Sequence, residues 1–261
     1  MSVASISVKE LLDAGVHYGH RTSRWNPRMK PYIFGKRNGI HIIDLRQTVR
    51  GLVKARRFLE KLASQGESVL FVGTKRQASG VVRMEVGDRH LPYVADRWLG
   101  GMLTNFTTVR RSLGRVEEIE RPEKTGEMNL YTKKTISMLQ REKQKILRNL
   151  QGVRALTRLP AALVIVDPRR DKIALSEALK LHIPTVALLD TDCDPKDIDI
   201  SIPCNDDSIR SIQVLLIHLI EAIEQGYASR KTEAPASQER PAPRPPAPPA
   251  QEGTAPATPA S

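Results

Sequence analysis

Three runs of consecutive apolar residues constrain the fold of this chain more than any other feature. They are VLFVG at 69–73, ALVIVD at 162–167 and TVALLD at 185–190. An apolar run of this length without alternation is typical of a strand buried on both faces of a parallel sheet. Neighbouring parallel strands must be joined by a crossover connection, which is usually a helix.

The segments around these runs carry the helical patterns that such crossovers require. A helix is expected from about Lys75, and apolar residues recur at helical spacing over 49–62, 173–181 and 209–223. HIIDL at 41–45 and IDISI at 198–202 add two short strands. This order predicts a doubly wound α/β domain with a mostly parallel sheet, flavodoxin-like or Rossmann-like, over residues 46–103 and 157–228.

The stretch 104–156 departs from this alternation. It carries two narrow apolar seams, one on Val109, Leu113, Val116 and Ile119 and the other on Ile136, Leu139, Ile146, Leu150 and Val153. Two long polar helices, each with a narrow seam, favour an inserted antiparallel coiled-coil hairpin that reaches roughly 25 Å from the body. A pair of ordinary surface helices is the alternative.

The two ends are expected to differ from the body. Ser7 to Glu10 form a capping-box pattern that predicts a short helix to about Ala14, and an extended, irregular arm completes residues 1–45 because Gly and Pro recur there. Residues 229–261 are dominated by Ala, Pro, Glu, Gln, Ser and Thr and are predicted to be a disordered tail. Its Pro-rich runs suit a proline-reading domain, but a solvated extension is the favoured interpretation.

The net charge of +12 at pH 7 indicates a polyanionic partner. The tail holds four basic and three acidic residues, so nearly all of this charge lies on the folded part. No secretory signal and no run of roughly 20 apolar residues is visible. Cys193 and Cys204 lack metal-type spacing with the six histidines. We therefore expect a cytoplasmic protein with no membrane contact, no cofactor and no metal site.

The clearest functional signal is a basic arm. From Ala14 to Ile43 the chain has no acidic residue, while aromatic side chains alternate with cations. Guanidinium and ammonium groups pair with phosphates, and aromatic rings stack on unpaired bases. The arm is therefore predicted to contact RNA, although a solvated basic loop is the alternative. Its aromatics are Tyr18, Trp25, Tyr32 and Phe34, and its cations are Arg21, Arg24, Arg28, Lys30, Lys36 and Arg37.

Weaker basic signals lie elsewhere. Two acid-free stretches on the expected hairpin, 128–141 and 143–166, suit a phosphate backbone, but basic helix faces are often only solvated. Thr74, Lys75 and Arg76 follow the VLFVG strand, where backbone N–H groups could bind an anion. Neither of the usual Gly-rich phosphate-binding motifs is present, so these three residues are modest RNA-phosphate candidates.

One motif suggests an enzyme. Asp190-Thr191-Asp192 follows an apolar strand, as do the nucleophile and acid of haloacid-dehalogenase-type phosphatases. Asp194 does not fit that family, whose motif usually lies near the N-terminus. An acidic turn at the sheet edge, extended by Asp197, Asp199, Asp206 and Asp207, is the favoured interpretation, and it should face away from RNA or toward a basic protein. No catalytic set is visible.

Several longer motifs resemble one family. LLDAGVHYGH at 11–20, WNP at 25–27, RNGIHIIDL at 37–45, LFVGTK at 70–75 and RWLGGMLTN at 97–105 are similar to the bacterial small-subunit ribosomal protein S-two family. Further matches are TKK at 132–134, LP at 159–160, DP at 167–168, IP at 183–184 and NDDSIRSI at 205–212. The resemblance runs in order from about Leu11 to Ile223 and leaves only the tail uncovered.

The resemblance implies a structural constituent of the small ribosomal subunit and not an enzyme. Such a protein binds ribosomal RNA (rRNA) between the head and the body of the subunit and helps recruit ribosomal protein S-one. Departures at Cys204, at Thr135 and in a short hairpin tip over 121–127 put the contacts of the tip in doubt. With the basic arm, the resemblance places the RNA contacts at Arg21, Arg24, Trp25, Asn26, Arg28, Lys30, Lys36, Arg37, Asn38, Thr74, Lys75, Arg76, Arg97, Trp98, Asn105, Arg110, Arg111, Lys133 and Lys134.

Overall fold

The computed structural model describes residues 7–126 and 131–233, and its centre is a five-stranded sheet in which all the paired strands are parallel. The strand order is β5-β4-β6-β7-β8. The three apolar runs form the middle of this sheet, and the doubly wound α/β prediction is confirmed. The strands are β4 (Val69–Val72), β5 (Tyr93–Val94), β6 (Ala162–Val166), β7 (Thr185–Leu189) and β8 (Ile200–Pro203).

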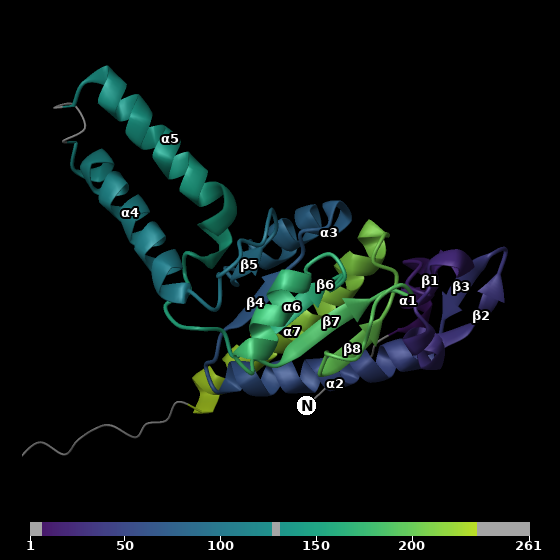
Figure 1. The fold of residues 1–261 in the computed structure, drawn as a ribbon. Helices are drawn as coiled ribbons and strands as arrows, with labels where there is room; N and C mark the ends of the chain where they lie inside the picture. The colour runs from purple at the N-terminus through teal and green to yellow at the C-terminus, as the bar shows by residue number, and fades with distance from the viewer. Residues whose placement is uncertain (1–6, 127–130, 234–261) are drawn as a thin grey trace, which may run out of the picture.

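Helices cover both faces of the sheet because side chains alternate between the faces along each strand. Phe71 belongs to the core on one face, where α2 (Leu45–Ser64), α3 (Arg76–Val81) and α7 (Ile209–Glu233) pack. Leu70 belongs to the core on the other face, with α6 (Lys172–Lys180) and the 97–105 loop. Figure 1 shows α2 running along the lower side of the sheet.

The N-terminal arm folds into a second sheet, so the expectation of an irregular arm is wrong. After α1 (Val8–Asp13), strands β1 (Tyr18–Arg21), β2 (Ile33–Arg37) and β3 (Ile40–Ile43) pair antiparallel in the order β1-β3-β2. Two short 3-10 turns, Thr22–Arg24 and Pro27–Tyr32, connect β1 to β2. The β2–β3 turn is Asn38-Gly39, both with positive φ, a pair that favours tight hairpins. We call this unit the arm sheet.

Two long helices project from the body at the end opposite the arm sheet (Figure 1). They are α4 (Phe106–Thr125) and α5 (Lys133–Leu150), and they run antiparallel within the predicted insertion 104–156. Leu113, Val116 and Ile119 are buried along the α4 seam. Arg115 Nε lies 3.0 Å from Glu142 Oε1, which ties the two helices together on one side. The coiled-coil description of this pair stays a prediction.

The last helix extends past the predicted start of the tail. α7 continues to Glu233, so the boundary placed at Ser229 is wrong by five residues. Helix-compatible residues persist until Pro235, and a proline disfavours helical backbone in the residue before it. The rest of the predicted tail, 234–261, lies outside the described residues. Among the described helices, none has the length and apolar character needed to span a bilayer.

Candidate nucleic-acid interface

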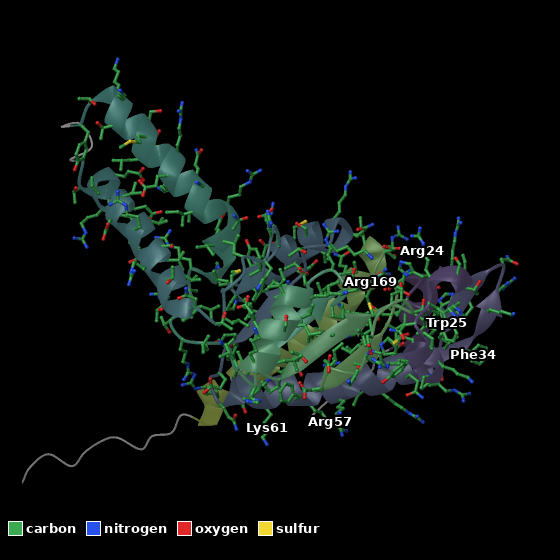
Figure 2. The ribbon with its side chains drawn as sticks, in the orientation of Figure 1. Arg24, Trp25, Phe34, Arg57, Lys61 and Arg169 are labelled. Atoms are coloured by element: carbon green, nitrogen blue, oxygen red, sulfur yellow. The ribbon has the colours of Figure 1, made fainter. Side chains whose placement is uncertain are left out.

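The arm sheet presents cations without carboxylate partners. Arg21, Arg24, Lys30, Lys36 and Arg37 are all exposed, and none forms an ion pair with another residue in 7–126 or 131–233. Arg28 differs from them, because its guanidinium pairs with the Asp194 carboxylate. Figure 2 shows Arg24, Trp25 and Phe34 together at this end of the molecule. The arm sheet therefore gathers unneutralised positive charge on one small unit.

Aromatic rings accompany these cations. Phe34 on β2 is 79% exposed and Tyr18 on β1 is 50% exposed, which is unusual for rings of this size. Trp25 is half-buried and packs against His41 with ring centroids 5.1 Å apart. Phe34 offers an open ring for stacking, whereas the Tyr18 ring lies against His17 with ring centroids 4.1 Å apart and Trp25 also holds the arm sheet together.

The arm sheet is fixed to the carboxyl edge of the main sheet. The backbone N–H of His20 donates to Thr191 Oγ1 at 2.9 Å, and that of Asn26 donates to the Thr191 carbonyl at 2.8 Å. A Cβ at Gly19 would lie only 2.6 Å from Thr191 Cγ2, so glycine permits this approach. The basic arm is therefore held on the parallel sheet by loops that follow its strands.

The strand order explains why this edge carries so much polar chemistry. The chain passes from β4 outward to β5 and returns beyond β4 to β6, so the connections from β4 and β6 leave in opposite directions. In doubly wound sheets, ligands usually bind at the carboxyl ends of the two neighbouring strands whose connections diverge in this way, which is called the topological switch point. Here Lys75 follows β4 and Asp167 follows β6, and their side chains meet there with Nζ 3.9 Å from Oδ2.

Lys75 is committed to an internal charge network. Its ammonium lies 2.7 Å from Asp206 Oδ1 and 2.6 Å from Asp207 Oδ1. Burial alone would lower the pKa of Lys75, but the two carboxylates outweigh it and raise that pKa. The Thr74 hydroxyl donates to Asp171 at 2.7 Å, while Arg76 is exposed. Lys75 and Thr74 therefore stabilise the edge, and of this loop only Arg76 is free to meet a phosphate.

The acidic residues of this edge are largely neutralised by neighbours. Asp190 is 1% exposed, and its carboxylate lies 2.9 Å from His20 Nδ1. This contact with Asp190 raises the pKa of His20 to about 9. Asp192 pairs with Arg169. Burial, together with repulsion from Asp190, raises the pKa of Asp206 to about 8.

Three of these side chains converge closely enough to hold a divalent cation. His20, Asp206 and Asp207 each offer a ligand atom, and these atoms lie within 4.8 Å of one another. One imidazole and two carboxylates are ligand types that zinc accepts, but the Lys75 ammonium already lies 2.7 Å from Asp206 and 2.6 Å from Asp207 and would repel a cation at this position. Asp206 Oδ2 is also buried without a hydrogen-bond partner among the described residues. Sequence spacing could not reveal this set, since His20 lies 186 positions before Asp206.

The remaining candidates lie at the hairpin and differ in accessibility. Arg97, Arg111, Lys133 and Lys134 are exposed and unpaired within the described part of the chain. The Arg110 guanidinium donates to the Leu156 carbonyl at 3.0 Å, and the Asn105 side chain accepts from the Thr108 hydroxyl at 2.8 Å. Trp98 is 5% exposed and its indole N–H donates to Glu177. Trp98 is thus a structural residue of the loop that carries the hairpin.

The predicted RNA-contact residues do not form one surface. Nine of them lie on or beside the arm sheet, three in the loop after β4, three in the 97–105 loop, and four on the hairpin helices, which project from the far end of the body (Figure 1). Because the arm sheet and the hairpin lie at opposite ends of the body, the predicted contacts form an arm-sheet surface and a separate hairpin surface.

Comparison with known proteins decides the family. The family model described as "Ribosomal protein S2" matches residues 11–226, which is most of the chain. The chain belongs to the ribosomal protein S2 family. It is 50% identical over 232 residues to "Small ribosomal subunit protein uS2" of Rhodopirellula baltica, with 89% of each chain covered. It is 49% identical over 228 residues to the protein of the same name from Geotalea uraniireducens, covering 87% of this chain and 89% of the relative.

Membership of the ribosomal protein S2 family confirms the resemblance and the expectation that the chain is not an enzyme. The phosphatase alternative is therefore unsupported. The geometry gives the physical reason: Asp190 is buried against His20, and Asp192 is paired with Arg169, so neither carboxylate is free to act as a nucleophile or an acid.

Sequence reasoning missed one strongly charged surface of this ribosomal protein S2 chain. Every exposed residue of α2 is a cation: Arg46, Arg50, Lys54, Arg57 and Lys61. Their spacing of three or four positions was the available signal, because residues at that spacing share one face of a helix.

Proposed function

We propose that this chain is a structural constituent of the small ribosomal subunit that binds rRNA through its arm sheet. One observation carries the proposal: Arg21, Arg24, Lys30, Lys36 and Arg37 are exposed on one unit and have no carboxylate partner among the described residues. The names of the relatives, small ribosomal subunit proteins, support the assignment to that particle.

The physical basis is phosphate neutralisation combined with stacking. Each phosphate that a cation neutralises releases a condensed counterion, so affinity falls steeply with salt. Phe34 lies beside the cations with its ring largely exposed, and stacking on an unpaired base contributes about 1 to 3 kcal/mol. The arm sheet thus combines a charge-dependent and a charge-independent contact.

The proposal includes the finer assignments that the family implies. The chain acts in the cytoplasm, on rRNA between the head and the body of the subunit, among neighbouring ribosomal proteins. Arg97 in the 97–105 loop and Arg111, Lys133 and Lys134 on the hairpin are exposed, which supports a second RNA contact. Arg76 and Asn38, both exposed, complete the accessible set.

The electrostatic test uses two matched variants. Replacing Arg24, Lys36 and Arg37 with Gln removes three arm-sheet charges. Replacing Lys172, Lys180 and Arg210 with Gln removes three exposed, unpaired charges elsewhere among the described residues. Binding to small subunits that lack this protein is measured across a salt series. The plot of log K against log salt should become shallower by about 2 to 3 for the arm-sheet variant, at 0.7 to 0.9 per phosphate, and stay unchanged for the control. Equal slopes for both variants would show that the arm sheet is not the electrostatic contact.

The recruitment of ribosomal protein S-one is a separate part of the proposal and rests on the family resemblance. Asp194 and Asp207 at the carboxyl edge are exposed but already paired with Arg28 and Lys75, so their charge adds no separate support for this role. Subunits reconstituted with and without this chain should differ in the amount of ribosomal protein S-one retained after sedimentation. Equal retention would exclude this role and leave the RNA contact untouched.

A further inference from the structure

The solvent face of α2 consists only of positive charge. Its exposed residues, Arg46, Arg50, Lys54, Arg57 and Lys61, follow one another at steps of four, four, three and four positions. At about 1.5 Å per residue they form a straight line of about 22 Å. None of the five forms an ion pair with another residue in the described part of the chain. We call this line the α2 face.

This arrangement is unfavourable for the isolated protein. Like charges four positions apart, as in Arg46 with Arg50, repel each other on a helix. Arg46 also lies in the first turn, where the helix dipole disfavours cations. The hairpin shows the usual compensation, since Lys143 lies 2.6 Å from Glu123 and Arg154 lies 2.6 Å from Glu120. The α2 face lacks such partners, so an external anion is the group that would neutralise it.

The helix beneath this face is rigidly held. Leu52 and Leu59 are fully buried in the core, and the Thr48 hydroxyl donates to the Pro203 carbonyl at 2.6 Å. A Cβ at Gly51 would lie 2.3 Å from the Ser201 carbonyl oxygen, so α2 rests directly on β8. The five cations therefore project from a fixed axis, and little ordering of the backbone is lost when a ligand binds.

The chemistry of the face favours an RNA backbone over a protein partner. The core of a protein interface is depleted in charged residues, whereas all five exposed residues of this face carry a positive charge. A straight line of cations matches a regular line of phosphates, and it offers no aromatic ring for stacking on bases. Figure 2 shows Arg57 and Lys61 on the lower side of the molecule, away from Arg24 and Trp25.

We propose that the α2 face binds an RNA phosphate backbone in addition to the contact on the arm sheet, without reading the RNA sequence. This inference rests on the proposed function and adds a second contact surface to it. The two surfaces together would extend the contact with rRNA from the arm sheet along the length of α2.

The test neutralises the middle of the face. Arg50, Lys54 and Arg57 are replaced with Gln and compared with the Lys172, Lys180 and Arg210 control, on small subunits lacking this protein and on purified small-subunit rRNA. The slope of log K against log salt should become shallower by about 2 to 3, and adding the arm-sheet substitutions should reduce it further by a similar amount. A charge-retaining variant, Arg50→Lys with Lys54→Arg and Arg57→Lys, should keep the wild-type slope.

Each other outcome overturns the inference in a recognisable way. A slope equal to that of the control on both RNA targets would show that α2 meets no phosphate. Weaker binding to subunits together with unchanged binding to purified rRNA would show that the α2 face contacts a protein and not RNA. A charge-retaining variant that behaves like the Gln variant would attribute the effect to the helix and not to charge. An arm-sheet effect without an α2 effect rejects only this inference, whereas the absence of both effects also rejects the proposed function.

Discussion

Glu177 organises the loop that joins the hairpin to the body, and its replacement is the sharpest test of the packing described above. The side chain lies on α6 and is 6% exposed. Its Oε1 accepts from the indole N–H of Trp98 at 3.0 Å and from the backbone N–H of Gly101 at 2.7 Å. Its Oε2 accepts from the backbone N–H groups of Leu103 at 3.0 Å and Thr104 at 3.1 Å. One carboxylate thus satisfies four N–H donors of a single loop.

Glu177→Gln keeps the shape of the side chain but replaces one acceptor oxygen with a donor NH2 group. The amide oxygen can still accept from Trp98 and Gly101, whereas the N–H groups of Leu103 and Thr104 then face another donor. A buried N–H left without an acceptor costs about 1 to 3 kcal/mol. The two together should lower the free energy of unfolding by about 2 to 6 kcal/mol, and toward the lower end because the Thr104 N–H is only partly buried. This is a large share of the roughly 5 to 15 kcal/mol typical of a domain.

The pH dependence adds an independent check. Burial alone would raise the pKa of Glu177, but the hydrogen bonds from Trp98 and the loop N–H groups outweigh it and hold the pKa below its usual value. A carboxyl with a lowered pKa in the folded state stabilises the protein above its unfolded pKa and loses that contribution as the pH falls through the folded value. The difference in the free energy of unfolding between wild type and Glu177→Gln should be largest at pH 7 and should decrease below about pH 4.3.

The assay is urea unfolding followed by tryptophan fluorescence between pH 7 and about pH 3, which covers the range in which the carboxyl becomes protonated. Glu118→Gln is the control, because Glu118 is 64% exposed and its only ion pair within 7–126 and 131–233 is with Arg115. This substitution should lower the free energy of unfolding by less than about 0.5 kcal/mol. A Glu177→Gln variant destabilised by less than about 1 kcal/mol at pH 7 would refute the reasoning. A difference in the free energy of unfolding that stays constant over the whole pH range would also refute it.

Three further predictions follow from other parts of the molecule. Trp25→Ala should weaken RNA binding by about 1 to 3 kcal/mol with an unchanged salt slope, because the indole carries no charge; a shallower slope would contradict this. Gly51→Ala should destabilise the protein by about 1 to 3 kcal/mol in thermal melts, because the added Cβ would meet the Ser201 backbone. The control Gly114→Ala adds its Cβ in open space on a helix and should be neutral or stabilising by up to about 1 kcal/mol. Equal effects of the two variants would show that α2 does not rest on β8. Deleting residues 234–261 should leave the melting temperature unchanged, and a lower value would reveal packing by this segment.

The sequence alone determined four of the five strands of the main sheet, most of its helices and the family. It missed the short edge strand β5, and the strand expected at 41–45 belongs to the arm sheet instead. Strands such as VLFV are buried on both faces, so their apolar character is continuous and visible without any knowledge of neighbours. The helices α2 and α7 were equally visible, because their buried stripes repeat at helical spacing. The same local view failed at the arm, where Gly and Pro suggested irregular structure although the Asn38-Gly39 turn was a hairpin signal.

Only the tertiary structure decided which charged residues remain free to bind RNA. In the sequence Lys75 and Arg24 are equally plausible phosphate ligands, yet Lys75 meets Asp206, 131 positions away, while Arg24 stays exposed and unpaired among the described residues. Trp98 meets Glu177 in the same way, 79 positions away. Such pairs depend on which strand ends lie side by side, because Coulomb attraction and hydrogen bonds act over a few ångströms of space and not along the chain.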